Sequence, residues 1–381
     1  MHRRELLQAA VVSPSFLIAG PVAGKDSRTY AYVGCFTTEQ RHGRGDGIHV
    51  YRIDSVTGSW THIQRLGDLV NPSFLITSHD RRFLYSAHGD EHSATAFSID
   101  AATGLLAPLN KGDTGGLNGA HLALSPDAKF LIVANYVSGT VAVLPVRPNG
   151  GLDDQIQLIP PEGKPGPHRV EQPGSHPHQI VFDPSGRFVL VPDKGLDRVF
   201  IFKFDAKTGR LTPTEQGSVA TRAGSGPRHL AFHRTLPVLW VLNELNSTAT
   251  TYAWNAATGF LKPLQILPCL PPDFTGDSTA AEIALSPNGR YLYCSNRGHD
   301  SIATFAVNPG SGLLGNTRWT PSNGKTPRYI GIEPGGQFLY CANEQGDSVT
   351  TFRISPATGG LTATGKPVVS PSAVSIAFAR F

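Results

Sequence analysis

The chain has 381 residues, of which 40% are hydrophobic and only 16% are charged, and its formal net charge is +4. This apolar content supports a large buried core and excludes a disordered polypeptide. The Lys and Arg residues are scattered, with no basic run that carries interleaved aromatic residues, so binding to nucleic acid is not expected. The frequent turns indicated by 41 Gly and 30 Pro, together with the lack of a clear helical apolar period, predict an all-β protein.

Residues 1–26 differ in character from the rest of the chain. Arg3 and Arg4 are followed by Leu6 and Leu7, by a mostly apolar stretch from residue 9 to residue 23, and by Gly24. This pattern is typical of a twin-arginine signal peptide, which exports folded proteins, and it predicts a periplasmic or extracellular location. The apolar stretch is too short and too interrupted to span a membrane. A leader on a cytoplasmic protein is the alternative.

One turn recurs along the chain, with the sequence Asp-x-x-Thr-Gly or Asn-x-x-Thr-Gly. The complete copies end at Gly58, Gly104, Gly209 and Gly259, and degenerate copies end at Gly150, Gly312 and Gly359. Successive glycines of this series lie 46 to 59 residues apart. Seven copies of the turn indicate seven structural units.

Each unit also carries short strands in phase with the turn. An apolar strand, a turn of the Ser-Pro type and a second apolar strand follow one another, as in residues 121–135 and 282–296. Further strands after a polar gap bring each unit to four. Four-stranded sheets of this size bury their faces against neighbouring sheets around a ring, so the units are predicted to be the blades of a β-propeller.

The inner strands of the blades are predicted around Leu75, Leu122, Ile180, Leu230, Ile283, Ile330 and Ile376. The last blade reaches the end of the sequence after its first strand, so it must take three strands from residues 30–34, 48–53 and 60–66. Pairing of the N- and C-terminal strands closes the ring and removes an exposed sheet edge. We therefore predict one all-β domain over residues 27–381, a monomeric seven-bladed β-propeller with four-stranded blades.

Ionisable residues gather at positions that a propeller brings to one mouth of its central channel. They are His178, Arg228, His229, Glu282 and Arg328 just before inner strands, and Glu244 and Arg297 just after second strands. Two long connections, residues 151–178 and 261–282, are predicted to fold over this mouth, because long ordered loops tend to be functional.

The motifs at this mouth are His176-Pro177-His178, Gly226-Pro227-Arg228-His229, Asn243-Glu244-Leu245-Asn246 and Ser295-Asn296-Arg297. Together with the second long connection, they resemble the propeller lactonase family that contains bacterial 6-phosphogluconolactonase and fungal carboxy-muconate cyclase. The resemblance extends over essentially the whole chain after the leader, and it implies hydrolysis of a sugar-derived lactone. In the fungal cyclase a His, two Arg and a Glu are implicated, and by motif they correspond to His178, Arg228, Arg297 and Glu244 as catalytic residues.

These residue types suit the opening of a lactone. Arg228 and Arg297 carry rigid forks of donors that can hold a carboxylate or phosphate group and stabilise charge on a lactone oxygen. His178 titrates near neutral pH and can activate water or protonate the leaving oxygen, and Glu244 can orient it or share the proton transfer. The chain has no Gly-x-Ser-x-Gly nucleophile motif. Contacts to the substrate are predicted for His176, His229, Glu282 and Arg328.

Other interpretations stay open at this point. Arg228 and Glu244 can form a buried ion pair that only holds the channel together, and His178 can be a structural residue at a loop end. A muconate-type cycloisomerase needs the same groups, and a non-catalytic propeller that binds protein or carbohydrate is a third possibility. No cofactor is expected, and no metal either, because His168, His176 and His178 have no carboxylate at ligand spacing with them.

The four cysteines are Cys35, Cys269, Cys294 and Cys341. Their spacings match no zinc or redox motif, so they are predicted to be small buried core residues. An exported protein can form disulfides, and the sequence leaves this open.

Export would also affect the choice of substrate. Phosphorylated sugar lactones of central metabolism are cytoplasmic. An exported member of the family is therefore expected to meet an unphosphorylated sugar lactone or another cyclic ester.

Overall fold

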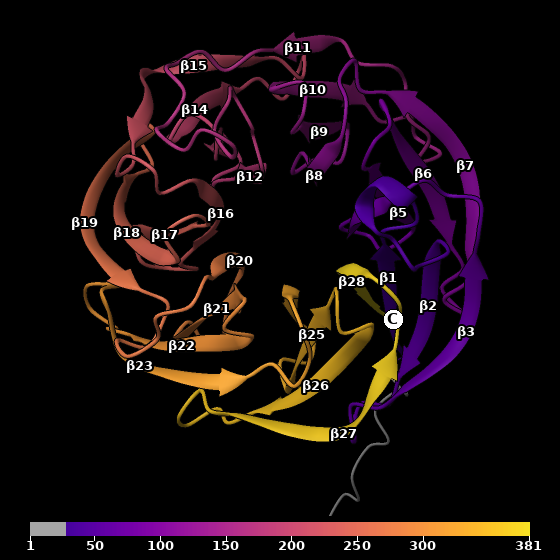
Figure 1. Ribbon diagram of the computed structural model, residues 1–381. Coiled ribbons are helices and arrows are strands. Elements are labelled where there is room, and N and C mark those ends of the chain that lie inside the picture. Colours follow the sequence, from indigo (N-terminus) through magenta and orange to yellow (C-terminus); the bar gives the residue numbers. More distant parts are fainter. Residues whose placement is uncertain (1–27) are drawn as a thin grey trace, which may run out of the picture.

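Seven four-stranded antiparallel sheets form a closed ring in the computed structural model, which describes residues 28–381 (Figure 1). The predicted signal peptide, residues 1–26, lies outside the described residues. Between residues 28 and 381 the only helical segment is the 3-10 turn η1 (Glu39–Arg41), and no helix there is long and apolar enough to cross a membrane. The prediction of an all-β propeller with seven blades is confirmed.

Each blade extends from an inner strand at the channel to an outer strand at the rim, and we number the blades 1 to 7 in chain order. Blade 1 contains β28 (Ala373–Arg380), β1 (Thr29–Cys35), β2 (Ile48–Ile53) and β3 (Trp60–Leu66), and blade 2 contains β4 (Pro72–Thr77), β5 (Phe83–His88), β6 (Ser93–Ile99) and β7 (Leu106–Asp113). Blade 3 contains β8 (Gly119–Leu124), β9 (Phe130–Asn135), β10 (Thr140–Pro145) and β11 (Gln157–Ile159), and blade 4 contains β12 (Val181–Phe182), β13 (Phe188–Asp193), β14 (Arg198–Phe204) and β15 (Leu211–Ala220). Blade 5 contains β16 (Pro227–Phe232), β17 (Val238–Asn243), β18 (Thr248–Asn255) and β19 (Phe260–Pro268), and blade 6 contains β20 (Thr279–Leu285), β21 (Tyr291–Arg297), β22 (Ser301–Val307) and β23 (Leu314–Pro321). Blade 7 contains β24 (Pro327–Ile332), β25 (Phe338–Asn343), β26 (Ser348–Ile354) and β27 (Leu361–Val369).

The ring closes within blade 1, where β1 pairs with β28 on one side and with β2 on the other. In this register Tyr32 lies opposite Ala377 on β28 and opposite Val50 on β2. The closure confirms the prediction that the C-terminal strand completes a sheet begun at the N-terminus. It leaves the inner edge of β1 paired, so that strand presents no open hydrogen-bonding edge.

The recurring glycine turns dock each blade onto the preceding one. All seven glycines have a positive φ, and a Cβ atom at any of them would meet a side chain near the start of the second strand of the preceding blade. At Gly104, for example, φ is 76° and the added Cβ would lie 2.3 Å from the ring of Tyr30. The hydroxyl group of Tyr32 donates to the carbonyl oxygen of Gly104 at 3.0 Å. The repeat in the sequence is therefore a repeat of contacts between blades.

The hydrophobic core is divided into seven clusters, most of which lie between neighbouring blades. One cluster joins Tyr30 and Ile48 of blade 1 to Leu84 and Phe97 of blade 2. Burial of these alternating apolar faces against the next sheet is the main favourable contribution to folding. The four cysteines are all buried and unpaired, as expected for core residues.

The two long connections reach the mouth of the channel, but both are shorter than predicted. The first contains the outer strand β11, which leaves residues 160–180 as its loop. The second is mostly strand, because β19 extends to Pro268 and β20 begins at Thr279. The sequence predicts loop at the end of β19, because exposed outer strands are less apolar than inner ones.

Candidate active site

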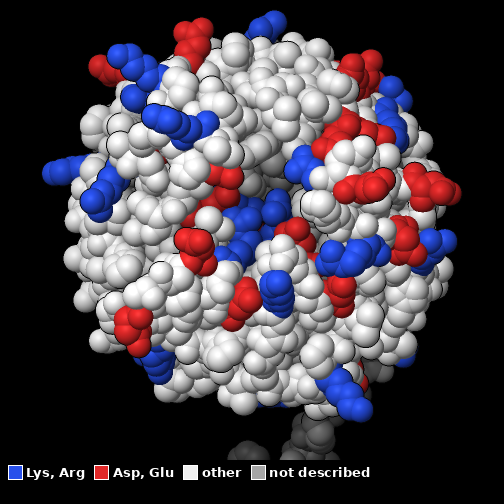
Figure 2. Space-filling view, in the orientation of Figure 1, with Lys and Arg blue, Asp and Glu red and all other residues white. Residues whose placement is uncertain are grey.

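A cavity of about 570 Å³ opens at one mouth of the central channel. Figure 2 shows basic side chains on the floor of this hollow and acidic side chains around its rim. Its walls include, from the positions before inner strands, Ser73, Phe74, Ala120, His178, Arg228, His229, Glu282, Arg328 and Val374, and, from the positions after second strands, Tyr136, Lys194, Glu244 and Arg297. Members of both sets of positions line this one cavity.

Local irregularities at the start of the inner strands turn side chains into the cavity. The pairing of β16 with β17 shifts register between Pro227 and His229, and the pairing of β24 with β25 shifts between Pro327 and Tyr329. The residues at these two shifts are Arg228 and Arg328. β-bulges re-aim side chains in this way beside functional sites. The same shift occurs in β20, where it includes Glu282.

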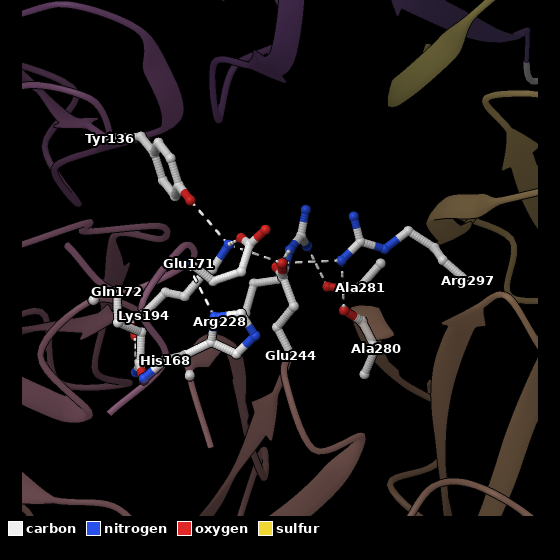
Figure 3. A network of polar contacts seen from close by, with 12 residues as sticks. Tyr136, His168, Glu171, Gln172, Lys194, Arg228, Glu244, Ala280, Ala281 and Arg297 are labelled. Carbon is white, nitrogen blue, oxygen red and sulfur yellow. Dashed lines mark hydrogen bonds and ion pairs between the residues drawn. The ribbon is translucent and has the colours of Figure 1, made fainter. Parts of the chain in front are cut away.

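The carboxylate of Glu244 lies at the centre of a buried ion-pair cluster (Figure 3). Its Oε2 lies 2.8 Å from Nε of Arg228, and its Oε1 lies 3.1 Å from Nζ of Lys194 and 3.2 Å from Nη2 of Arg297. Burial alone would raise the pKa of this carboxyl group, but the charges of Arg297, Lys194 and Arg228 outweigh burial and hold the pKa well below its ordinary value of 4.5. Glu244 is therefore ionised at neutral pH.

Both arginines of this cluster are also held by carbonyl groups of β20. Nη1 of Arg228 donates to the carbonyl oxygen of Ala281, and Nη2 of Arg297 donates to that of Ala280 at 3.1 Å. Burial lowers the pKa of Arg228 to about 10, although Glu244 favours the charged form. The guanidinium group thus stays charged at neutral pH, and blade 6 fixes the position of a side chain that blade 5 contributes.

Lys194 is a member of the cluster that the sequence reasoning did not include among the site residues. Besides Glu244, its Nζ contacts the Tyr136 hydroxyl at 2.9 Å and Oε2 of Glu171 at 2.6 Å. Burial would lower the pKa of Lys194, but Glu244 and its other partners raise it above the ordinary value of 10.5. A signal was present, because Lys194 directly follows the second strand of its blade, as Glu244 does in blade 5.

A second buried pair lies in the same cavity, formed by His229 and Glu282 from neighbouring blades. Nδ1 of His229 lies 2.6 Å from Oε1 of Glu282. Burial raises the pKa of Glu282 to about 8, with partial opposition from Arg228, and burial with the charge of Arg228 lowers the pKa of His229 well below 6.5. Within residues 28–381, Nε2 of His229 and Nδ1 of the adjacent His178 have no hydrogen-bond partner.

Seven of the eight predicted site residues line the cavity, and His176 does not. The ring of His176 stacks on Tyr136 at a centroid distance of 4.4 Å, and its Nδ1 lies 2.8 Å from the Tyr136 carbonyl oxygen. His176 therefore supports a wall residue, and a substrate contact at this side chain stays a prediction. Arg328 lies in the wall, with its Nη1 3.4 Å from Oε2 of Glu344.

The expected partnership of Glu244 with His178 is corrected. Both carboxylate oxygens of Glu244 are occupied by the cations around it. His178 instead lies against the ring of His229, at a centroid distance of 5.1 Å. Burial and the charge of Arg228 lower the pKa of His178 well below 6.5, so it is neutral at physiological pH.

Comparisons with a family model, with curated relatives and with solved structures all match this chain to lactonases. Residues 30–378 match the family model described as lactonase, 7-bladed beta-propeller. The chain is 33% identical to 6-phosphogluconolactonase from Bacillus subtilis over 300 residues, which are 78% of this chain and 83% of the Bacillus protein. It is 30% identical to 6-phosphogluconolactonase from Formosa agariphila over 313 residues, which are 78% of this chain and 84% of that protein. Among solved structures, the periplasmic gluconolactonase PpgL from Pseudomonas aeruginosa superimposes with a TM-score of 0.85 at 32% identity, over 92% of this chain and 99% of that one.

Proposed function

Because the chain belongs to the lactonase family of seven-bladed β-propellers, it is a carboxylic-ester hydrolase, and we propose that it opens a sugar-derived lactone in the cavity at the channel mouth. The observation that carries this proposal is the ion-pair cluster around Glu244, which supports fixed arginines beside two neutral histidines in one cavity. Hydrolysis of an ester ring requires donors for the carbonyl oxygen and a group that accepts a proton.

The cationic wall suits the charge that develops during ring opening. Five basic side chains line the cavity, namely Arg41, Lys194, Arg228, Arg297 and Arg328, against four acidic ones, Glu171, Glu244, Asp277 and Glu282. One of the acids, Glu282, has its pKa raised to about 8, so much of it is protonated at neutral pH. Attack on the carbonyl carbon places negative charge on the carbonyl oxygen, and buried arginines held in position stabilise that charge without reorganisation.

Glu244 contributes to this site by holding the cations in place. Because its carboxyl group stays ionised and is shared by Lys194, Arg228 and Arg297, it is a poor proton donor or acceptor. We propose that it fixes the direction of the two guanidinium groups. His178 keeps a role at the substrate, where its neutral ring can hydrogen-bond to the ring oxygen that leaves.

An unphosphorylated lactone is the substrate that we propose. The pattern of residues 1–26 predicts export, and the structural relative from Pseudomonas aeruginosa is named a periplasmic gluconolactonase. A second relative is named for the phosphorylated lactone, so the two candidate substrates differ by one phosphate group.

The test is a kinetic comparison of glucono-δ-lactone and 6-phosphoglucono-δ-lactone with the purified protein, after subtraction of spontaneous opening. We expect catalysed opening of both, with the higher kcat/KM for the unphosphorylated lactone. The Arg228→Ala variant should lose about 100-fold or more in kcat/KM, as expected when one donor to a developing oxyanion is removed.

The exposed Arg210→Ala variant serves as the matched control, because it removes the same group from the surface. It should retain the kcat/KM of the unmodified protein. Equal rates for Arg228→Ala and Arg210→Ala, with both variants folded by circular dichroism, would contradict the assignment of the cavity.

A further inference from the structure

The pair formed by His229 and Glu282 is separate from the Glu244 cluster, and its geometry suits proton transfer. His229 lies at the start of β16 in blade 5, and Glu282 lies in β20 of blade 6. Oε1 of Glu282 accepts a hydrogen bond from the backbone N–H of Ile283 at 3.0 Å, and the N–H of Glu282 donates to Oγ of Ser295 at 3.0 Å. The carboxylate is therefore held in one position before any substrate binds.

The contact with Glu282 also determines which nitrogen of His229 is available. When Glu282 is ionised, the neutral ring of His229 donates through Nδ1, which lies 2.6 Å from the carboxylate oxygen, and it carries its free lone pair on Nε2. Nε2 is buried and has no partner within residues 28–381. The ring is held by His178 and His121, at centroid distances of 5.1 Å and 5.5 Å, and by Phe74 at 6.2 Å. The imidazole ring of His229 therefore cannot rotate toward another hydrogen-bond partner without displacing these three rings.

The other two candidates for a general base are less suitable. Glu244 is surrounded by three cations, which stabilise its ionised form and weaken its affinity for a proton. His178 has no carboxylate partner within residues 28–381, so nothing in the wall compensates the positive charge that it would acquire beside Arg228. His229 has such a partner in Glu282, which stabilises the imidazolium as it forms.

We propose that His229 is the general base of the lactonase reaction and that Glu282 is its positioning residue; this inference rests on the proposed function. Nε2 of His229 takes a proton from a water molecule as the water oxygen bonds to the carbonyl carbon of the lactone. The bond from that carbon to the ring oxygen then breaks, and the ring oxygen takes the proton back from Nε2. One lactone and one water give one hydroxy acid, and the base returns to its starting state.

The pair is active as a base when Glu282 is ionised. Burial raises the pKa of Glu282 to about 8, and Arg228 and Arg328 oppose that rise. The titratable and charged groups that face the pair are His121, His178, Arg228, Glu244, Cys294, Arg297, Arg328 and Tyr329. We therefore expect kcat/KM to rise with pH through a value near 8, because the deprotonated form is the reactive one.

Two variants test the pair, and a third is the control. His229→Gln removes the base and should lower kcat by about 100- to 10,000-fold while KM changes by only a few fold. Glu282→Gln keeps the shape but does not titrate, so kcat should fall and the rise of kcat/KM near pH 8 should disappear. His233→Gln changes a buried histidine directly after the far end of β16 that does not line this cavity, and it should keep both the rate and the pH profile.

The outcomes separate this inference from the proposed function. If the unmodified protein opens lactones while His229→Gln and Glu282→Gln retain its kcat and pH profile, the pair is not the base and the lactonase proposal stands. If His229→Gln raises KM and leaves kcat unchanged, His229 binds substrate only, and the inference is overturned. If the unmodified protein opens no lactone of the panel, the proposed function fails, and the catalytic role of the pair fails with it.

Discussion

At the scale of single residues, the cavity wall is unusual because so many charges are buried together. Glu244 alone accepts three cations, and each of these side chains has given up hydration to reach it. Such clusters are costly to assemble, but the loss of one member is more costly, because it leaves the remaining charges buried without compensation. The cluster therefore links the stability of blades 4, 5 and 6 to the geometry of the site.

We predict that Glu244→Gln lowers the free energy of unfolding at pH 7 by roughly 3–5 kcal/mol. The pKa of Glu244 is lowered in the folded state, so its contribution is fully present above the ordinary value of 4.5 and is lost as the pH falls below it. The difference between the two proteins should therefore shrink toward acid. Urea unfolding at a series of pH values measures it.

The exposed Glu215→Gln variant provides the reference for this measurement, since it removes the same charge from the surface. It should unfold like the unmodified protein at every pH. A constant difference between Glu244→Gln and the unmodified protein from pH 7 to pH 3 would show that the ionisation of Glu244 contributes nothing.

At the scale of secondary-structure elements, the turn between the third and fourth strands has two functions. In blade 1, Oδ1 of Asp54 accepts hydrogen bonds from the backbone N–H groups of Val56 and Thr57, which stabilises the turn itself. The glycine that follows then allows a ring of the preceding blade to approach closely. At the other end of the blade, register shifts at the start of the inner strands direct Arg228 and Arg328 into the cavity.

Two glycine substitutions distinguish backbone strain from packing between blades. Gly365 has a φ of 68° with no atom within 4 Å of an added Cβ, whereas Gly104 has a φ of 76° and an added Cβ would overlap the ring of Tyr30. We expect Gly365→Ala to lower the free energy of unfolding by about 1 kcal/mol, from backbone strain alone. Gly104→Ala should lower the free energy of unfolding by a further ~1–3 kcal/mol, because the preceding blade must shift. Urea unfolding of both variants gives the difference, and equal losses would contradict the docking role of the turn.

At the scale of the whole molecule, ring closure depends on pairing between the two ends of the described chain. The N–H of Arg28 donates to the carbonyl oxygen of Phe381 at 3.1 Å, and the N–H of Phe381 donates to that of Arg28 at 2.9 Å. The cavity depends on this closure as well, because Val374 at the start of β28 belongs to its wall.

A circular permutant tests how far closure matters. Joining residue 381 to residue 28 through a short Gly-Ser linker and opening the chain between residues 67 and 68 would make every blade contiguous. We expect this permutant to fold and to retain kcat/KM within a few fold, because no paired strand is lost. Removal of residues 373–381 should instead give aggregation, since it exposes an edge of β1. A soluble, cooperatively unfolding truncated protein would contradict this role for β28.

The sequence by itself determined the fold, because the features that specify a blade are local. The turn glycines at their regular spacing, the paired apolar strands and the single strand left over at Ile376 were sufficient to predict seven blades and their closure. The convergence of residues such as Arg228 and Arg297 on one mouth followed from the same repeat, since equivalent positions of every blade face the same end of the channel.

Only the tertiary structure decided which charged groups are partners. Glu244 contacts Lys194, Arg228 and Arg297 instead of His178, and the partner of His229 is Glu282, 53 residues away in the next blade. The repeat brings all of these residues to one cavity, but the choice among them depends on differences of a few ångströms in bulges and loops. Electrostatic interactions in a buried wall vary steeply over such distances, and a spacing in the sequence does not contain that information.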